Sequence, residues 1–311
     1  MAEMTVSRRK RFERSAAPAP MQLTERDLHL LAHVARHRFL SSAQLAALDG
    51  GSPQNVLRAL RVLFDHGYVD RPLAQLASMP VLGPQPLVYG LGAKGARALR
   101  EYSHHLGGGG DFTEKNKRAG GIFIEHTLAV AEFMTAIELS CRSLPDVELI
   151  REPDIIAAAP EATRHAREPL RWVVRPPQGR NELWSVVPDG LFALSFADGT
   201  AAYFMLEIDR GTIPIVRNSL DHRSIARKLA TYWEGWKAKR HEVQFGVKQM
   251  RVLFVTESAD RVRHMLSAVD HVTGGKGSNF FLFIDRPTLA AAGPLEVEWI
   301  SGKRAAVRLT D

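Results

Sequence analysis

Apolar residues along the N-terminal third of the chain recur at every third or fourth position, with polar residues between them. This spacing indicates helices that bury one face and expose the other. Two short apolar runs, at residues 68–71 and 87–91, predict a pair of strands between the third and fourth helices. The predicted helices cover residues 24–37, 43–48, 52–66 and 94–102.

Residue types at the helix ends support these assignments. Thr24 is suited to cap the first helix, and Ser41 with Gln44 has the spacing of a capping box. Pro53 fits the first turn of the third helix, and Gly67 fits a stop after it. Three helices followed by two strands is the order of a winged helix-turn-helix, whose third helix enters the major groove of DNA.

The polar face of the predicted third helix carries residue types that read DNA bases. Arginine pairs with guanine, and asparagine or glutamine pairs with adenine. A solvated helix face and a protein-interaction module are the alternatives. Residues 72–86, where the wing is expected, contain no lysine or arginine, so the wing is not expected to contact phosphates. The candidate DNA-binding residues are Gln54, Asn55, Arg58 and Arg61.

The rest of the chain has a different pattern. Four consecutive glycines predict a linker, and the five prolines of residues 153–179 predict irregular structure. Further helices are predicted over residues 122–144, 224–236 and 259–269, and strands over 147–150, 191–196, 201–208, 252–256 and 280–284. The sequence thus predicts an α/β (α+β) chain in four parts: a basic, disordered arm over 1–21, a winged helix-turn-helix over 22–102, a linker over 103–121 and an α/β domain over 122–311.

Composition and charge narrow the class of protein. The chain has 311 residues, a formal net charge of +7 and an isoelectric point near 9.7, which favours a polyanionic partner such as nucleic acid. The basic run at residues 8–11 is suited to phosphate contacts. A single cysteine, Cys141, excludes an internal disulfide and a cysteine-based metal site. No apolar run reaches the ~20 residues of a membrane span, and no secretory signal is apparent, so a cytoplasmic location is expected.

Candidate chemistry centres on three carboxylates near one predicted hairpin. Asp189 precedes one strand, and Glu207 and Asp209 lie at the end of the next. Residues two apart on a strand share a face, so Glu207 and Asp209 are expected together. A cation stabilises carboxylates held this close, and an all-oxygen donor set selects Mg²⁺ or Mn²⁺. The candidate metal ligands are Asp189, Glu207 and Asp209.

The turn between the two strands decides whether these carboxylates meet. A two-residue turn would place Asp189 opposite Ile208, on the wrong face. A three-residue loop over 198–200 would place Asp189 opposite Asp209 and diagonal to Glu207, at a spacing of ~7–8 Å that a bridging metal can span. The metal hypothesis therefore requires a longer loop or a bulge.

The strand order, with proline before Asp189 and then Glu207, resembles the core of the PD-(D/E)xK nuclease superfamily, the restriction-endonuclease-like fold. The resemblance implies a central mixed sheet and a metal bound by Asp189 and Glu207. The lysine of that motif would fall at position 209, where this chain has aspartate. Some members carry the lysine on the following helix, where Lys228 shares a stripe with Tyr232. The resemblance therefore implies Asp189, Glu207 and Lys228 as catalytic residues.

The chain as a whole also resembles the replication-relaxation family of plasmids and other mobile elements. The resemblance covers roughly residues 22–260. It rests on residues 23–27 and 88–95 of the predicted winged helix and on the string Phe-Met-Leu-Glu-Ile-Asp-Arg-Gly-Thr at 204–212. It implies a protein that acts in the replication, mobilisation or processing of DNA of a mobile element.

Two function hypotheses follow. In the first, the protein binds double-stranded DNA through the winged helix and processes it as a Mg²⁺-dependent nuclease. In the second, it is a non-enzymatic transcriptional regulator whose inactive nuclease-like domain serves dimerisation or partner binding. A metal-dependent hydrolase of other substrates has little support. The expected partners are double-stranded DNA, a second copy in a homodimer and proteins of a replication or mobilisation complex, with no membrane.

Overall fold

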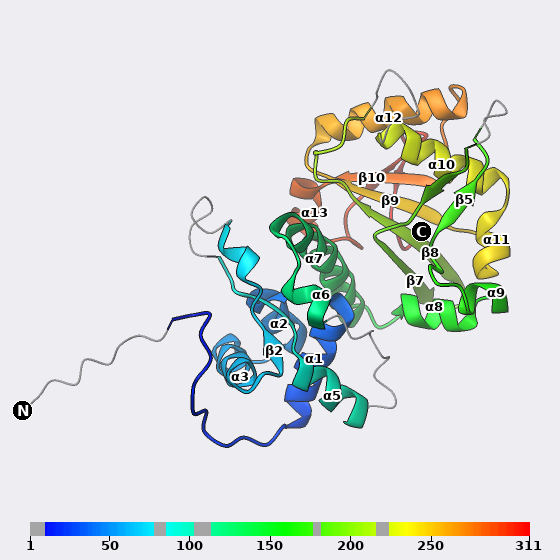
Figure 1. Ribbon diagram of the computed structural model, residues 1–311. Coiled ribbons are helices and arrows are strands. Elements are labelled where there is room, and N and C mark those ends of the chain that lie inside the picture. The colour runs from blue at the N-terminus through cyan, green and yellow to red at the C-terminus, as the bar shows by residue number, and fades with distance from the viewer. Residues whose placement is uncertain (1–9, 78–84, 103–112, 177–181, 216–223) are drawn as a thin grey trace, which may run out of the picture. The chain divides into compact units, whose positions relative to one another are not determined.

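The computed structural model in Figure 1 describes residues 10–77, 85–102, 113–176, 182–215 and 224–311. Contacts divide the chain into two compact units, Met1–Thr135 and Ala136–Asp311. With its many helices and one large mixed sheet, the protein is of the α+β type. The glycine run of the predicted linker lies outside the described residues, and the C-terminal part of that segment contains a short helix, α6 (Thr113–Lys117).

The N-terminal unit contains the predicted helices in the predicted order. Its three-stranded antiparallel sheet has the order β1-β3-β2. The sequence pattern does not predict the short strand β1, and it does not predict the short 3₁₀ helix η1 (Leu73–Ala77) that follows β2. The elements are α1 (Glu25–His37), β1 (Phe39–Ser41), α2 (Ser42–Asp49), α3 (Pro53–His66), β2 (Val69–Asp70), β3 (Val88–Leu91), α5 (Ala93–Tyr102) and the first part of α7 (Gly121–Ser143).

Side-chain caps fix where the first two helices begin. The Thr24 hydroxyl accepts from the Asp27 N–H at 3.2 Å, while Asp27 Oδ2 accepts from the Thr24 N–H at 3.0 Å. Ser41 and Gln44 form the same reciprocal pair at the start of α2. Both predicted caps are therefore confirmed, and each satisfies backbone N–H groups that a helix start leaves unpaired.

The C-terminal unit is built on a seven-stranded mixed sheet of order β12-β11-β10-β9-β8-β7-β4. Strands β8, β9 and β10 run parallel to one another, and the remaining neighbours are antiparallel. The strands are β4 (Val147–Arg151), β7 (Gly190–Phe196), β8 (Ala201–Ile208), β9 (Arg251–Thr256), β10 (Phe281–Asp285), β11 (Trp299–Ser301) and β12 (Ala306–Val307). The helices include α10 (Ile225–Lys237), α11 (Arg240–Phe245), α12 (Ala259–Thr273) and α13 (Arg286–Ala292).

The segment expected to be irregular, residues 153–179, contains regular structure, so that prediction is wrong. It includes part of α8 (Glu152–Ala158), α9 (Glu161–Arg164) and β5 (Trp172–Val174), which pairs with β6 (Trp184–Val186) in a separate sheet. Pro153 and Pro160 are compatible with helices because they lie in the first turn of α8 and at the cap before α9, where no intrahelical N–H is needed.

Aromatic packing fixes helix α10 over the sheet. Trp172 of β5 is fully buried, and its ring lies 5.7 Å from that of Tyr232 on α10. Trp172 also stacks on Phe280, with ring centroids 6.4 Å apart. Large aromatic side chains dominate the burial energy of a core. This packing therefore holds one face of α10 toward the strand that carries Glu207.

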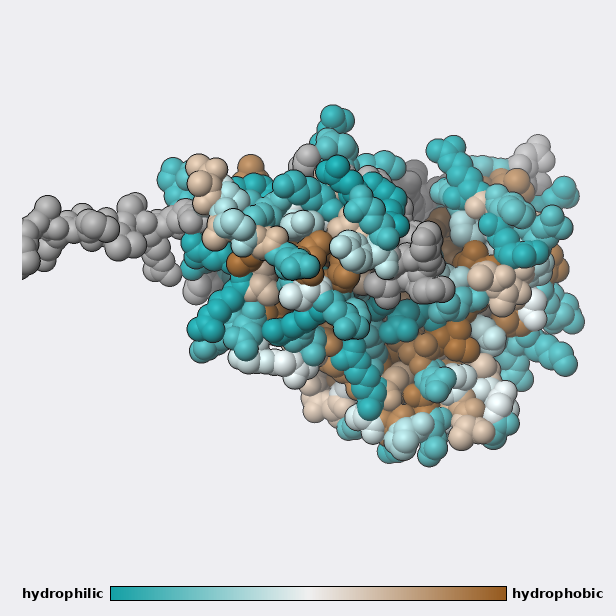
Figure 2. Space-filling view, turned by 90° about the horizontal axis from the view of Figure 1, so that it is seen from below, coloured by the Kyte–Doolittle hydropathy of each residue, from teal (hydrophilic) through white to brown (hydrophobic). Residues whose placement is uncertain are grey.

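Figure 2 shows one face on which hydrophilic side chains predominate and apolar side chains are exposed in separate patches. Among the described helices, none is long and apolar enough to cross a membrane.

Candidate functional site

Helix α3 exposes all four candidate DNA-binding residues. Pro53 occupies its first turn, and Gly67 ends it in the left-handed conformation at φ 84°. Val56, Leu60 and Leu63 are fully buried on the opposite side. The exposed residues are Gln54, Asn55, Arg58 and Arg61.

Two features organise the exposed face of α3. Arg58 Nη1 donates to Asn55 Oδ1 at 3.2 Å, so these two side chains lie against each other. Leu57 and Val62 are 47% and 41% exposed, so apolar groups flank the polar ones. The face therefore combines hydrogen-bonding, cationic and apolar groups.

The hairpin of β7 and β8 brings Asp189 and Glu207 together. Its register pairs Gly190 with Leu206, so the next residue outward on each strand places Asp189 opposite Glu207. The Asp189 N–H donates to the Leu206 carbonyl at 2.8 Å. The Ile208 N–H donates to Asp189 Oδ2, also at 2.8 Å. Two of the three predicted metal ligands thus face each other at one end of the hairpin.

The turn that sets this register differs from both predicted turns. The Phe196 N–H donates to the Thr200 carbonyl at 3.0 Å, so the loop is residues 197–199, with Gly199 at φ 81°. The loop begins one residue before the predicted turns, so neither predicted register is correct. This register places Asp189 opposite Glu207 without a bulge in either strand.

Glu207 is buried in a network of hydrogen bonds. It is 1% exposed, and Lys228 Nζ donates to its Oε2 at 2.5 Å. The Tyr232 hydroxyl donates to its Oε1 at 2.6 Å. Burial raises the pKa of Glu207 to about 7 despite the opposing effect of Lys228, and the neighbouring charge of Asp189 adds to the rise. The cation of Lys228 therefore favours the ionised form of Glu207 and stabilises it in the buried site.

Helix α10 supplies both partners of Glu207. Ser224 caps the helix, since its hydroxyl accepts from the Arg227 N–H at 3.1 Å. Lys228 and Tyr232 lie four residues apart, on one stripe of the helix. Burial alone would lower the pKa of Lys228, but Glu207, Asp189 and Asp209 raise it above its ordinary value. Burial, followed by the charge of Glu207, raises the pKa of Tyr232 well above the usual range. Lys228 is therefore cationic, and Tyr232 is a neutral hydrogen-bond donor.

Asp209 is held by different partners. Thr256 Oγ1 donates to its Oδ2 at 2.7 Å, and Arg261 pairs with it through Nη2 at 2.9 Å and through Nε. Arg261 Nη2 also donates to the Ile213 carbonyl at 2.6 Å, which ties down the loop after β8. The charge of Asp209 is thus compensated by Arg261 within the fold.

The glycine of the Glu-Ile-Asp-Arg-Gly-Thr string has a steric role. Gly211 adopts φ 70°, and a Cβ there would lie 2.6 Å from Glu257 Oε2. Glycine adopts this left-handed backbone without strain, whereas a Cβ here would be strained and would displace the Glu257 side chain. The string therefore combines a buried carboxylate, an ion pair and a tight turn.

The predicted three-carboxylate set does not form. Among the described residues, no three His, Cys, Asp or Glu side chains are grouped so that they could hold a metal ion. Asp189 and Glu207 converge, with Lys228 beside them, whereas Asp209 pairs with Arg261. As two facing oxygen donors, Asp189 and Glu207 fit a hard divalent cation in ligand type.

Two residues of the site are absent from the sequence-based set, namely Thr256 and Arg261. Thr256 ends β9, which runs parallel to β8, and Arg261 lies in the first turns of α12. The carboxyl ends of neighbouring parallel strands meet at one edge of a sheet. The polar residue at the end of β9 was therefore the sequence feature that could have predicted Thr256 in this site.

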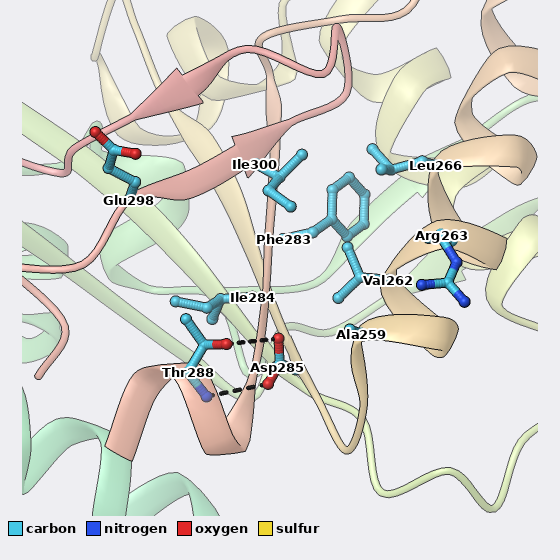
Figure 3. A pocket seen from close by; sticks show the side chains of 10 residues that line it. All are labelled: Ala259, Val262, Arg263, Leu266, Phe283, Ile284, Asp285, Thr288, Glu298 and Ile300. Atoms are coloured by element: carbon cyan, nitrogen blue, oxygen red, sulfur yellow. Dashed lines mark hydrogen bonds between the residues drawn. The ribbon is translucent and has the colours of Figure 1, made fainter. Parts of the chain in front are cut away.

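A separate pocket lies between α12, β10, α13 and β11 (Figure 3) and encloses about 310 Å³. Its apolar lining includes Phe283, Ile284 and Ile300. Asp285 caps α13, accepting from the Thr288 N–H at 3.0 Å and from its hydroxyl at 2.9 Å. This pocket contains no converging set of polar groups comparable to that around Glu207.

These features define an α+β protein with a polar, exposed helix face in one unit and a carboxylate–lysine cluster in the other. The chain matches the family described as Replication-relaxation over residues 31–249, more than two thirds of its length, and it belongs to that family. Membership indicates a role in the replication or mobilisation of mobile elements. No curated protein and no solved structure matches the chain significantly.

Proposed function

We propose that the protein binds double-stranded DNA through α3 during replication or mobilisation of a mobile element. The observation that carries the proposal is the division of this helix into a buried apolar side and a side where Gln54, Asn55, Arg58 and Arg61 are all exposed. Long polar side chains on one exposed helix face are the groups that reach base edges and phosphates.

The surrounding elements support a winged helix-turn-helix. Helices α1, α2 and α3 precede the strands β2 and β3, and in that arrangement the third helix enters the major groove. The exposed Leu57 and Val62 would contact thymine methyl groups beside the polar residues. The net charge of +7 favours association with the polyanion.

The double variant Arg58→Ala/Arg61→Ala tests this proposal. Fluorescence anisotropy with a labelled mixed-sequence duplex should show binding weakened by ~1–3 kcal/mol for each arginine. The matched control, Arg97→Ala/Arg100→Ala on α5, removes the same charge and should retain most of the affinity. Equal affinity of the wild type and the α3 variant would refute the assignment of α3.

A second candidate activity is metal-dependent cleavage of DNA, favoured by the convergence of Asp189, Glu207 and Lys228. Asp189 and Glu207 would hold Mg²⁺ or Mn²⁺, and the bound ion would polarise a phosphodiester and acidify a water molecule. Lys228, which stays charged, would stabilise negative charge on the scissile phosphate.

Other contacts favour a non-enzymatic regulator with the same unit. Lys228 and Tyr232 already engage both oxygens of Glu207, and Arg261 neutralises Asp209. Lys228 and Arg261 thus compensate two of the three carboxylates without a metal ion. In this alternative, the C-terminal unit would serve a homodimer or a protein partner of a replication complex.

Nicking of supercoiled DNA in Mg²⁺ or Mn²⁺ separates the two alternatives. A nuclease should convert the plasmid to open circles, and Asp189→Asn and Lys228→Met should abolish conversion. Asp260→Asn, which removes an exposed carboxylate on α12, is the control and should remain active. DNA binding without nicking by the wild type would assign the regulator.

A further inference from the structure

The described part of the N-terminal arm, residues 10–20, follows a defined path beside α3. Figure 1 shows this dark blue segment passing α3 before it joins α1. The sequence predicts a disordered arm here, and residues 1–9 lie outside the described part of the chain. The contacts of residues 10–20 with α3 and β2 determine where the arm's basic side chains are presented.

Arg14 anchors the arm to the C-terminal end of α3. Its guanidinium donates to the Phe64 carbonyl and, at 3.2 Å, to the Val69 carbonyl. It pairs with Asp70 and lies 4.5 Å from the centroid of the Phe64 ring. One side chain thus joins the arm to both α3 and β2.

Backbone contacts on either side of Arg14 reinforce the anchor. The Ser15 N–H donates to Asp65 Oδ1 at 2.9 Å. Arg71, which follows β2, donates to the carbonyl of Arg11. The arm is therefore held at points before and after Arg14, and the exposed residues 10 and 11 lie next to the ordered surface.

These contacts extend the basic surface beyond α3. Arg71 lies 4.0 Å from the centroid of the Phe64 ring and donates to the Tyr89 hydroxyl at 3.2 Å. Burial raises the pKa of Tyr89, and the charge of Arg71 opposes the rise. Arg71 thus joins the C-terminal end of α3 and strand β3 to the arm at Arg11.

We propose that the arm is a second DNA contact, in which Lys10 and Arg11 bind backbone phosphates beside the site read by α3. Arg14 is the positioning residue. This inference rests on the proposed DNA binding by α3. Residues 72–86, where the wing is expected, contain no lysine or arginine, so the arm would supply the phosphate contacts that the wing lacks. Lys10 forms an exposed ion pair with Glu13 at 3.0 Å, and pairs this exposed are weak enough for a phosphate to replace the carboxylate.

The salt dependence of binding measures these contacts. The probe is the labelled mixed-sequence duplex, titrated by anisotropy between 50 and 200 mM salt, and each phosphate contact contributes about −0.9 to the slope of log K against log salt. Lys10→Ala/Arg11→Ala should make the slope shallower by about 1.8, so that the loss of affinity across this range becomes roughly 12-fold smaller. The control Arg263→Ala/Lys303→Ala removes two exposed charges from the other unit and should leave the slope unchanged.

The two proposals fail in different ways. A wild type without salt-dependent binding to the duplex would overturn DNA binding, and the arm contact with it. A wild type that binds with the same slope as Lys10→Ala/Arg11→Ala would overturn the arm contact alone.

Non-additivity tests the positioning role of Arg14. Arg14→Ala should lower the affinity toward that of Lys10→Ala/Arg11→Ala, and combining all three substitutions should lower it little further. Fully additive losses would show that Arg14 acts independently of Lys10 and Arg11, and would refute its positioning role.

Discussion

Replacing Lys228 with methionine isolates the role of the buried ion pair with Glu207. Methionine keeps much of the apolar stem of lysine but removes the charge that lies 2.5 Å from Glu207 Oε2. Glu207 then keeps the hydrogen bond from Tyr232 and the repulsion of Asp189. The variant should therefore be less stable at pH 8.

The magnitude follows from burial and the remaining contacts. Removing one partner of a buried ion pair typically costs ~3–5 kcal/mol. The Lys228 side chain is 29% exposed, so solvent screens part of its interaction. Burial also raises the pKa of Glu207 to about 7, so this carboxyl can take up a proton when the cation is lost. We therefore expect a loss of ~2–3 kcal/mol in the free energy of unfolding.

Urea denaturation followed by circular dichroism measures this loss. The control Lys237→Met lies on the same helix, and its ion pair with Glu234 joins a lysine side chain that is 50% exposed. Exposed pairs contribute under ~1 kcal/mol, so this control should remain close to wild type. Adding Glu207→Gln to Lys228→Met should restore part of the stability, because no unpaired charge then remains buried.

Two results would refute this reasoning. Equal stabilities of Lys228→Met and Lys237→Met would show that the pair with Glu207 contributes no more than a surface pair. A double variant that is less stable than Lys228→Met by the full cost of Glu207→Gln alone would show that the two residues are not coupled.

Three further predictions concern other parts of the fold. Arg26 lowers the pKa of Asp49, so Asp49→Asn should melt at a lower temperature than wild type at pH 7. The stability that a carboxylate with a lowered pKa contributes is present above its pKa in the unfolded chain and is lost as the pH falls through its pKa in the folded protein. The difference in melting temperature should therefore close as the pH falls below about 4. Gly235→Ala should destabilise the protein to urea, since the new Cβ collides with the buried Trp172 ring and overpacking costs ~1–3 kcal/mol against a helix-propensity gain of ~1 kcal/mol; a more stable variant would contradict this. Burial raises the pKa of Cys141 to about 11, so alkylation at pH 8 should be slow in the native protein and fast in urea, whereas equal rates would show a solvated thiol.

Local patterns in the sequence predict much of the N-terminal unit. Helices α1 and α3 follow from apolar periodicity, and α2 follows from its capping box. The helix starts follow from Thr24, Ser41 and Pro53, because caps depend only on nearby residues. The stripe of α10 that carries Lys228 and Tyr232 also follows from local spacing, but that spacing does not select Glu207 as their partner.

Contacts between distant segments were beyond prediction from the sequence. The pairing of Asp209 with Arg261 joins residues 52 positions apart, and nothing in the local pattern selects Arg261 over other arginines. Strand β12 has two residues, too few for an alternation to be visible. The hairpin register depends on whether the loop begins at residue 197 or 198. Gly199 is compatible with either loop, so the sequence alone does not decide between them.

The length of the 197–199 loop has a consequence for how such a protein can change over generations. One inserted residue that was taken up by the strand pairing, rather than by a longer loop, would turn Asp189 toward the opposite side of the sheet, since strand side chains alternate. Glu207, Lys228 and Tyr232 would keep their identities and their mutual contacts. A lineage could therefore lose the pairing of Asp189 with Glu207 through a single codon insertion while every candidate residue remained in its sequence, and a comparison that scores residue identity alone would count that descendant as intact.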